Sequence, residues 1–183
     1  MKNFTDLIQR HEAELQKLHS AVHDGFDRRE TSKLARRDWE LTAKRFREYG
    51  SEVDVLLKRC LVEGIAGDSE LRRFAFCFVE CDPYYFRSGY AMEGLLQKIK
   101  KLSLSEVEKG LLRKLILKRI DSKALRNFRR ICRLIPIIDI VGFSNEVTSR
   151  ARSQDPSIKR RAEFALSYFP IDCKHRGEGF VVV

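Results

Sequence analysis

The chain has 183 residues, of which 43% are hydrophobic and 34% are charged, and it carries a formal net charge of +10. This composition excludes a disordered chain, and the length suits one domain with a sizeable core. We expect a single α-helical domain over residues 1–170 and a short C-terminal tail over residues 171–183. The positive charge favours acidic partners.

Apolar residues at helical spacing predict a series of helices in the first half of the chain. The expected helices cover residues 3–22, 28–49, 53–61, 68–81 and 90–102. Asp24-Gly25 ends the first apolar pattern, Ser51 can cap the third helix and Asp68 the fourth. Asp82-Pro83 ends the fourth, because a proline disfavours helical geometry at the residue before it.

The second half is predicted to be helical as well. The expected helices cover residues 105–120, 121–135, 137–141, 144–152 and 155–169. Ser105 and Glu108 have the spacing of a capping box, and Asp155 followed by Pro156 is typical of a helix start. Only residues 180–183 suggest a strand. The sequence therefore predicts an all-α fold of about eight or nine helices of roughly 10 to 20 residues, besides the short segment 137–141.

The chain carries neither a secretion signal nor a membrane span that we can identify. Charges interrupt the N-terminal segment every few residues, and the longest apolar runs fall far short of the roughly 20 residues that a bilayer requires. None of the five cysteines forms a CxxC pair, which favours buried thiols over a disulfide framework. We expect a cytoplasmic protein.

Two windows of the sequence, residues 68–79 and 155–166, share a pattern. Each has an Asp, an aliphatic residue three positions later, a base four positions later and an alanine seven positions later. The Asp can cap a helix, and the alanine lets a neighbouring helix approach closely. The pattern resembles the second helix of a HEAT repeat. That resemblance implies an irregular array of stacked helices, with an ordinary α-bundle as the alternative.

The excess positive charge lies in the centre of the chain. Residues 97–133 contain thirteen bases and three acids, a difference equal to the net charge of the whole chain. Helical spacing would align many of these bases into a basic ridge able to follow phosphates, and a solvated helix surface is the alternative. The ridge consists of Lys109, Arg113, Lys114, Lys118, Arg126, Arg129, Arg130 and Arg133.

A second basic cluster could extend the ridge. It consists of Arg150, Arg152, Lys159, Arg160 and Arg161. An aromatic group, Tyr84, Tyr85 and Tyr90, could contact a base or a protein partner, although packing between helices would also explain it.

No motif points to catalysis, a metal or a cofactor. His19 and His23 are four residues apart on a predicted helix but lack a third ligand nearby, and neither a P-loop nor a GxSxG sequence is present. We therefore predict no catalytic residues, no metal site and no cofactor.

Three functions remain open. The first is a non-enzymatic interaction module, of the adaptor or immunity type, whose basic central face binds another protein with an acidic surface. The second is a DNA- or RNA-binding protein that uses the ridge of residues 97–133. The third is an enzyme that acts on nucleic acid on a helical-repeat scaffold, as the HEAT-like DNA glycosylases do, although their catalytic Asp and stacking Trp pair cannot be located in this sequence. We place the interaction module first and expect no membrane partner.

Overall fold

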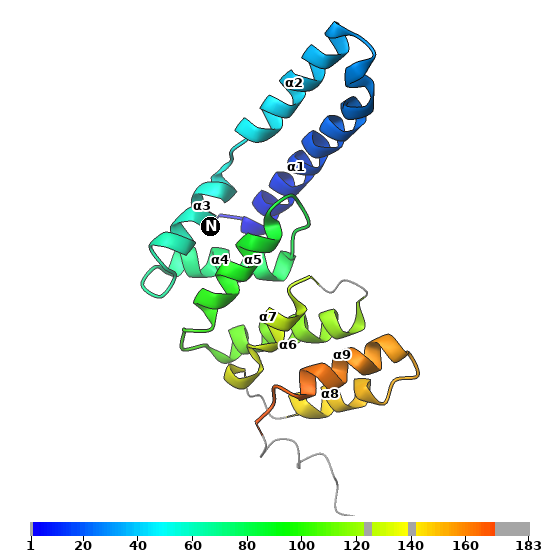
Figure 1. Cartoon of the computed structure of the whole chain (residues 1–183). Helices are drawn as coiled ribbons and strands as arrows, with labels where there is room; N and C mark the ends of the chain where they lie inside the picture. Colours follow the sequence, from blue (N-terminus) through cyan, green and yellow to red (C-terminus); the bar gives the residue numbers. More distant parts are fainter. Residues whose placement is uncertain (1, 123–125, 139–141, 171–183) are drawn as a thin grey trace, which may run out of the picture. The chain divides into compact units, whose positions relative to one another are not determined.

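The computed structural model describes residues 2–122, 126–138 and 142–170. Within these residues the chain forms nine α-helices, two 3-10 helices and no strand, which confirms the all-α prediction (Figure 1). The predicted tail and the strand suggested at its end lie outside the described residues. Packing divides the chain into two compact units, Met1–Lys98 and Ile99–Val183, which are described in turn. The single domain stays a prediction.

The N-terminal unit begins with a helical hairpin. Helix α1 (Phe4–Phe26) continues through η1 (Asp27–Glu30) into α2 (Lys33–Glu48), which returns alongside α1 (Figure 1). The prediction that the first helix ends near residue 22 was wrong. Gly25 lies inside α1, where a Cβ atom would be only 3.2 Å from Cδ1 of Trp39 on α2. The glycine therefore permits a close approach of the two helices and does not end the first one.

Trp39 also holds the hairpin together by a hydrogen bond. Its Nε1 donates to the backbone oxygen of Val22 at 3.1 Å, and its ring meets the ring of Phe26 edge-on. The only tryptophan of the chain thus packs between α1 and α2.

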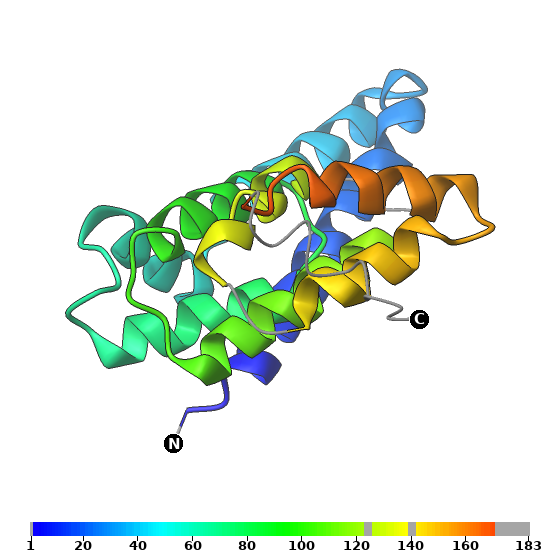
Figure 2. The same cartoon turned by 90° about the horizontal axis from the view of Figure 1, so that it is seen from below.

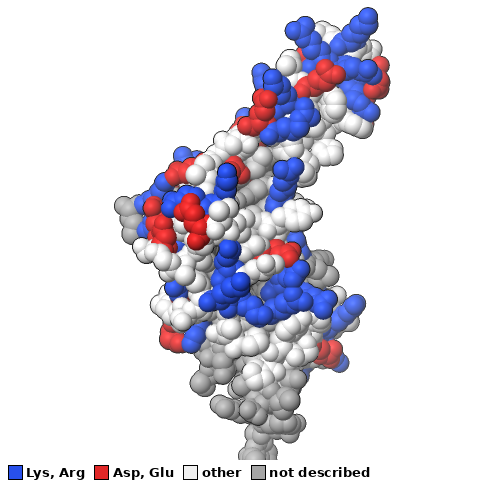
Figure 3. Space-filling view, turned by 60° about the vertical axis from the view of Figure 1, so that its left-hand side comes forward, with Lys and Arg blue, Asp and Glu red and all other residues white. Residues whose placement is uncertain are grey.

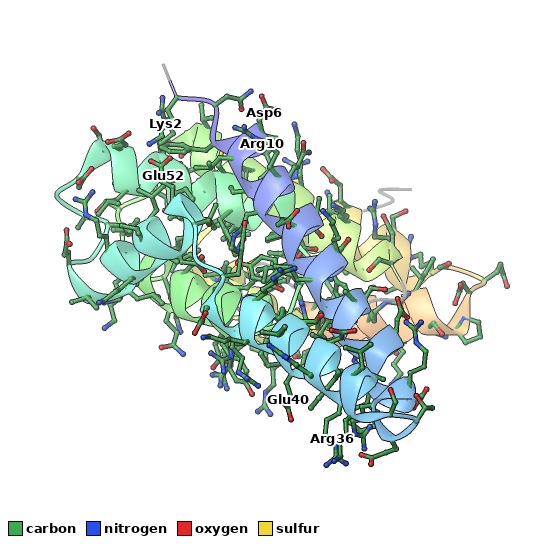
Figure 4. The ribbon with its side chains drawn as sticks, turned by 90° about the horizontal axis from the view of Figure 1, so that it is seen from above. Lys2, Asp6, Arg10, Arg36, Glu40 and Glu52 are labelled. Carbon is green, nitrogen blue, oxygen red and sulfur yellow. The ribbon has the colours of Figure 1, made fainter. Side chains whose placement is uncertain are left out.

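The surface of the N-terminal unit pairs many of its own charges. Arg36 on α2 contacts Glu30 at 2.6 Å, and Lys2 pairs with Glu52 (Figure 4). Glu40 follows Arg36 by one turn on α2 (Figure 4). In the space-filling view, Lys and Arg side chains alternate with Asp and Glu along the α1–α2 hairpin (Figure 3). On this face the hairpin therefore offers no field of one sign.

The N-terminal unit contains three further helices. These are α3 (Glu52–Val62), α4 (Ser69–Cys81) and α5 (Ser88–Ile99). The first half of α1 contacts α3 and α4, and the ring of Phe4 lies edge-on to that of Phe74 at 5.4 Å. Phe74 is fully buried, as are most apolar residues of α4. The core of this unit therefore lies around α4.

The C-terminal unit contains the remaining helices. They are α6 (Glu106–Asp121), α7 (Phe128–Cys132), η2 (Ile135–Ile137), α8 (Phe143–Ala151) and α9 (Pro156–Leu166). Helices α8 and α9 lie side by side, and both contact α6 (Figures 1 and 2). Their shared core includes Ile116, Phe143, Val147 and Ala162, all at most 1% exposed.

The predicted helix over residues 121–135 was wrong in its extent. Asp121 is the last residue of α6, and α7 begins only at Phe128. Asn127 has a positive φ of 59°, which breaks the helical path, and asparagine tolerates this left-handed geometry better than most residues. Pro136 lies in η2 and limits the segment at its other end. Part of the next predicted helix, residues 139–141, lies outside the described residues.

The described cysteines behave as structural thiols. Cys60, Cys77, Cys81 and Cys132 are all unpaired, and Cys60 and Cys132 are fully buried. Burial raises the pKa of Cys60 to about 11 and that of Cys132 to about 12, so both stay protonated at neutral pH.

Among the described helices, none combines the length and the apolarity needed to cross a bilayer.

Candidate anionic-ligand site

Part of the predicted basic ridge is neutralised by acids of the same unit. On α6, Lys109 contacts Glu106 at 2.7 Å, and Arg113 forms an ion pair with Glu146 of α8. The first pair lies within α6, and the second joins α6 to α8. The two bases therefore contribute less to an external field than the sequence suggests.

Arg150, from the predicted extension, is also paired. Its Nε lies 2.8 Å from Oδ1 of Asp121 and its Nη2 lies 2.9 Å from Oδ2, so the guanidinium holds the carboxylate in a forked contact. Its Nη1 donates to the backbone oxygen of Glu146. This arginine joins α8 to the end of α6.

The other predicted bases differ in exposure. Lys114, Lys118 and Arg129 of the ridge are exposed, as are Arg152, Lys159 and Arg160 of the extension. Arg126, Arg130 and Arg133 are half-buried. The candidate site is built from bases of both groups.

Residues of α7 and α9 line a pocket of about 560 Å³. Its described lining consists of Phe128, Arg129, Ser157, Arg160, Arg161 and Phe164. Three arginines thus share one pocket with two aromatic rings. One of the arginines comes from the predicted ridge and two from its predicted extension.

The start of α9 explains how one helix supplies four lining residues. The carboxylate of Asp155 accepts the backbone N–H groups of Ser157 and Ile158, at 2.7 and 3.2 Å, and Pro156 occupies the first turn. Residues 157, 160, 161 and 164 follow the three- and four-residue spacing of a helix, and they therefore share one face of α9. The alanines at 162 and 165 are fully buried and lie on other faces of the helix. The small side chains face the core, and the arginines face the pocket.

Helix α7 supplies the opposite wall. Phe128, Ile131 and Cys132 are buried and anchor this short helix, while Arg129 remains exposed. The left-handed turn at Asn127 sets the direction in which α7 begins. The anchor and the turn together place an arginine beside α9.

The three arginines of the pocket differ in their partners. Arg161 donates from Nε to the backbone oxygen of Ile120 at 2.6 Å, which ties it to the C-terminal turn of α6. Arg129 and Arg160 form no ion pair with any carboxylate in the described part of the chain. Two guanidinium groups are thus available for an anion, and a third is held in place beside them.

Phe164 gives the pocket an exposed aromatic surface. Its side chain is 40% exposed, whereas Phe128 is only 7% exposed. The ring centroids of the two lie 5.8 Å apart, and the ring centroid of Tyr168 lies 5.4 Å from that of Phe164. Phe164 was not among the residues that the sequence predicted for a site. Its spacing of four from Arg160 was the available signal.

The predicted aromatic group lies in the N-terminal unit. Tyr84 and Tyr90 are strongly exposed, and Tyr85 is half-buried against His11 at a centroid distance of 4.8 Å. Tyr85 and Tyr90 line a second pocket, of about 510 Å³, which also contains Asp54. Tyr85 therefore serves packing, while Tyr90 faces solvent.

His11 is the main buried polar residue beside this second pocket. Its Nδ1 lies 2.7 Å from Oγ of Ser51, and its Nε2 lies 3.8 Å from Oδ1 of Asp54. Ser51 already caps α3 by accepting the N–H of Val53. The cluster thus fixes α1 to the start of α3. Burial lowers the pKa of His11 below its usual 6.5, although the Asp54 carboxylate acts in the opposite direction.

This lowered pKa predicts an acid-sensitive fold. Because unfolded chains bind the His11 proton at a higher pH than the folded state does, the free energy of unfolding should fall as the pH drops below about 6.5. Urea titrations at about pH 7.5 and about pH 5.5 measure the fall. His11→Gln should reduce the pH-dependent fall, and an equal fall in variant and wild type would refute this account.

No converging metal site is found in the described part of the chain, where no three His, Cys, Asp or Glu side chains gather. His19 and His23 contact each other edge-on at 4.6 Å, and His19 also packs against Phe46 and Phe86. Aromatic packing accounts for the histidine pair.

Comparison with known proteins adds no relative: no family model, no curated protein and no solved structure matches this chain.

Proposed function

We propose that the protein is a non-enzymatic binding module whose C-terminal unit holds an acidic macromolecule in the pocket between α7 and α9. The observation that carries this proposal is the pair Arg129 and Arg160, which lack described carboxylate partners, while Lys109, Arg113 and Arg150 are paired. Unpaired guanidinium groups beside an apolar wall favour an anionic partner.

The helical-repeat arrangement remains part of the proposal. Two features of α4 and α9 support it. Asp68 accepts the N–H groups of Glu70 and Leu71, as Asp155 does at the start of α9. The alanines seven positions after each Asp are fully buried. Helical repeats of this kind present binding surfaces rather than chemistry.

Charge reversal tests the proposal. The variant Arg129→Glu/Arg160→Glu should bind labelled heparin, a generic polyanion, at least about tenfold more weakly than the wild type, because two attractive contacts become repulsive. Fluorescence titration at several salt concentrations measures the affinity, and wild-type binding should weaken as salt rises.

Two control variants separate the pocket from general charge. Arg37→Glu/Arg45→Glu makes the same change of net charge on exposed positions of α2 and should keep nearly wild-type affinity. Lys114→Glu/Lys118→Glu changes exposed bases of the predicted ridge outside the pocket lining. Equal losses in all three variants would show that net charge alone drives binding and would overturn the proposal.

A further inference from the structure

We infer that the ligand of the α7–α9 pocket is single-stranded nucleic acid, with one base against Phe164 and the neighbouring phosphates on Arg129 and Arg160. This inference rests on the proposed function and names its partner class. It follows from the combination, within one pocket, of an exposed ring and two guanidinium groups that have no carboxylate partner among the described residues.

The ring of Phe164 is accessible to a flat ligand. Its side chain is 40% exposed, and the rings of Phe128 and Tyr168 are tilted against it by 36° and 60°, so neither is stacked parallel on it. Every nucleic-acid base has an aromatic face, and stacking on exposed phenylalanine or tyrosine binds bases with little sequence preference. Phe164 is therefore suited to receive an unpaired base.

The arginines lie where phosphates of the same strand would pass. Arg160 precedes Phe164 by one helical turn, and Arg129 reaches the pocket from α7. A planar guanidinium can hold two phosphate oxygens at once. Lys159, which is exposed, directly precedes Arg160 in the sequence. Arg133, which is half-buried, follows Arg129 by four positions. Both bases could bind further phosphates.

Pocket size and the exposed ring distinguish a single strand from the other anionic partners. About 560 Å³ is in the range of sites that enclose one ligand unit such as a nucleotide. A base within a duplex is stacked on both faces and cannot reach Phe164 without being flipped out. An acidic protein would use the arginines but would gain little from the ring.

The experiment compares binding of oligonucleotides by Phe164 variants. Fluorescence anisotropy with a labelled oligothymidylate of about 15 nucleotides should give a dissociation constant that rises about five- to a hundredfold in Phe164→Ala. Phe164→Trp should restore binding, because indole also stacks on bases. Heparin affinity should change little in either variant, because heparin has no aromatic base.

A matched control tests an exposed phenylalanine outside the pocket. Phe26 is 45% exposed and has Arg29 over its ring, with the guanidinium carbon 3.3 Å from the ring centroid. Phe26→Ala should leave oligonucleotide affinity unchanged. Circular dichroism and thermal melting establish that each variant is folded. A loss in Phe26→Ala as large as in Phe164→Ala would overturn the inference.

Other ligands separate failure of this inference from failure of the proposed function. Unchanged oligonucleotide binding in Phe164→Ala, with heparin binding still lost on reversing Arg129 and Arg160, would overturn the single-strand inference and leave an acidic protein as the partner. Equal affinity for a duplex of the same length would also overturn it. Equally tight binding of a mononucleotide would do so too, since a strand then adds nothing.

Discussion

Phe143→Ala is expected to lower the free energy of unfolding by about 3–5 kcal/mol, because it removes a fully buried aromatic ring and leaves a cavity. Phe143 is 1% exposed, and its ring lies 5.3 Å from that of Phe169. The guanidinium of Arg113 lies over the same ring at 5.9 Å from its centroid. The substitution therefore removes contacts to α6 and to the residues that follow α9.

Chemical denaturation followed by circular dichroism measures this loss. Val107→Ala is a suitable control in the same unit, since Val107 is 83% exposed and its truncation should change stability by no more than about 0.5 kcal/mol. A loss below about 1 kcal/mol for Phe143→Ala would contradict its place in the core. Because α8 packs directly on α9, heparin binding should weaken together with stability.

Helix starts could be predicted from the sequence because their interactions are local. The capping box of Ser105 and Glu108 is present, with the serine N–H donating to the glutamate at 2.8 Å and the Glu108 N–H donating back to the serine oxygen at 3.3 Å. Asp68 and Asp155 also cap α4 and α9 as expected. Each of these contacts spans at most three residues, so residue type and spacing were sufficient.

Contacts between distant residues could not be predicted in the same way. The ion pair of Asp121 with Arg150 joins residues 29 positions apart, and the sequence alone gives no reason to choose this partner among the many nearby bases. Phe128 begins α7 directly after the left-handed turn at Asn127, and its contact with Phe164 on α9 joins residues 36 positions apart. Basic character could be located from the sequence, but which arginines remain unpaired depends on tertiary structure.

Long-range contacts also explain why two helix boundaries were predicted wrongly, one at a glycine and one at an asparagine. Asp24-Gly25 suggested a helix end, yet Gly25 lies inside α1, where its missing side chain leaves room for Trp39 of α2. Asn127 lay inside a predicted helix, yet it adopts a left-handed conformation. Both residue types permit several backbone geometries, and long-range packing selects among them.

Ala162→Leu is expected to destabilise the protein by about 1–3 kcal/mol, because the site has no room for a larger side chain. Ala162 is 0% exposed on the side of α9 opposite the pocket, and α9 packs against both α8 and α6. A leucine would push α9 outward and displace Arg160 and Phe164 with it. Heparin and oligonucleotide affinity should therefore fall in parallel with stability. Ala13→Leu, at an exposed position of α1, should leave both unchanged. Wild-type stability in Ala162→Leu would mean that the helices do not approach each other as closely as a small residue at this position allows.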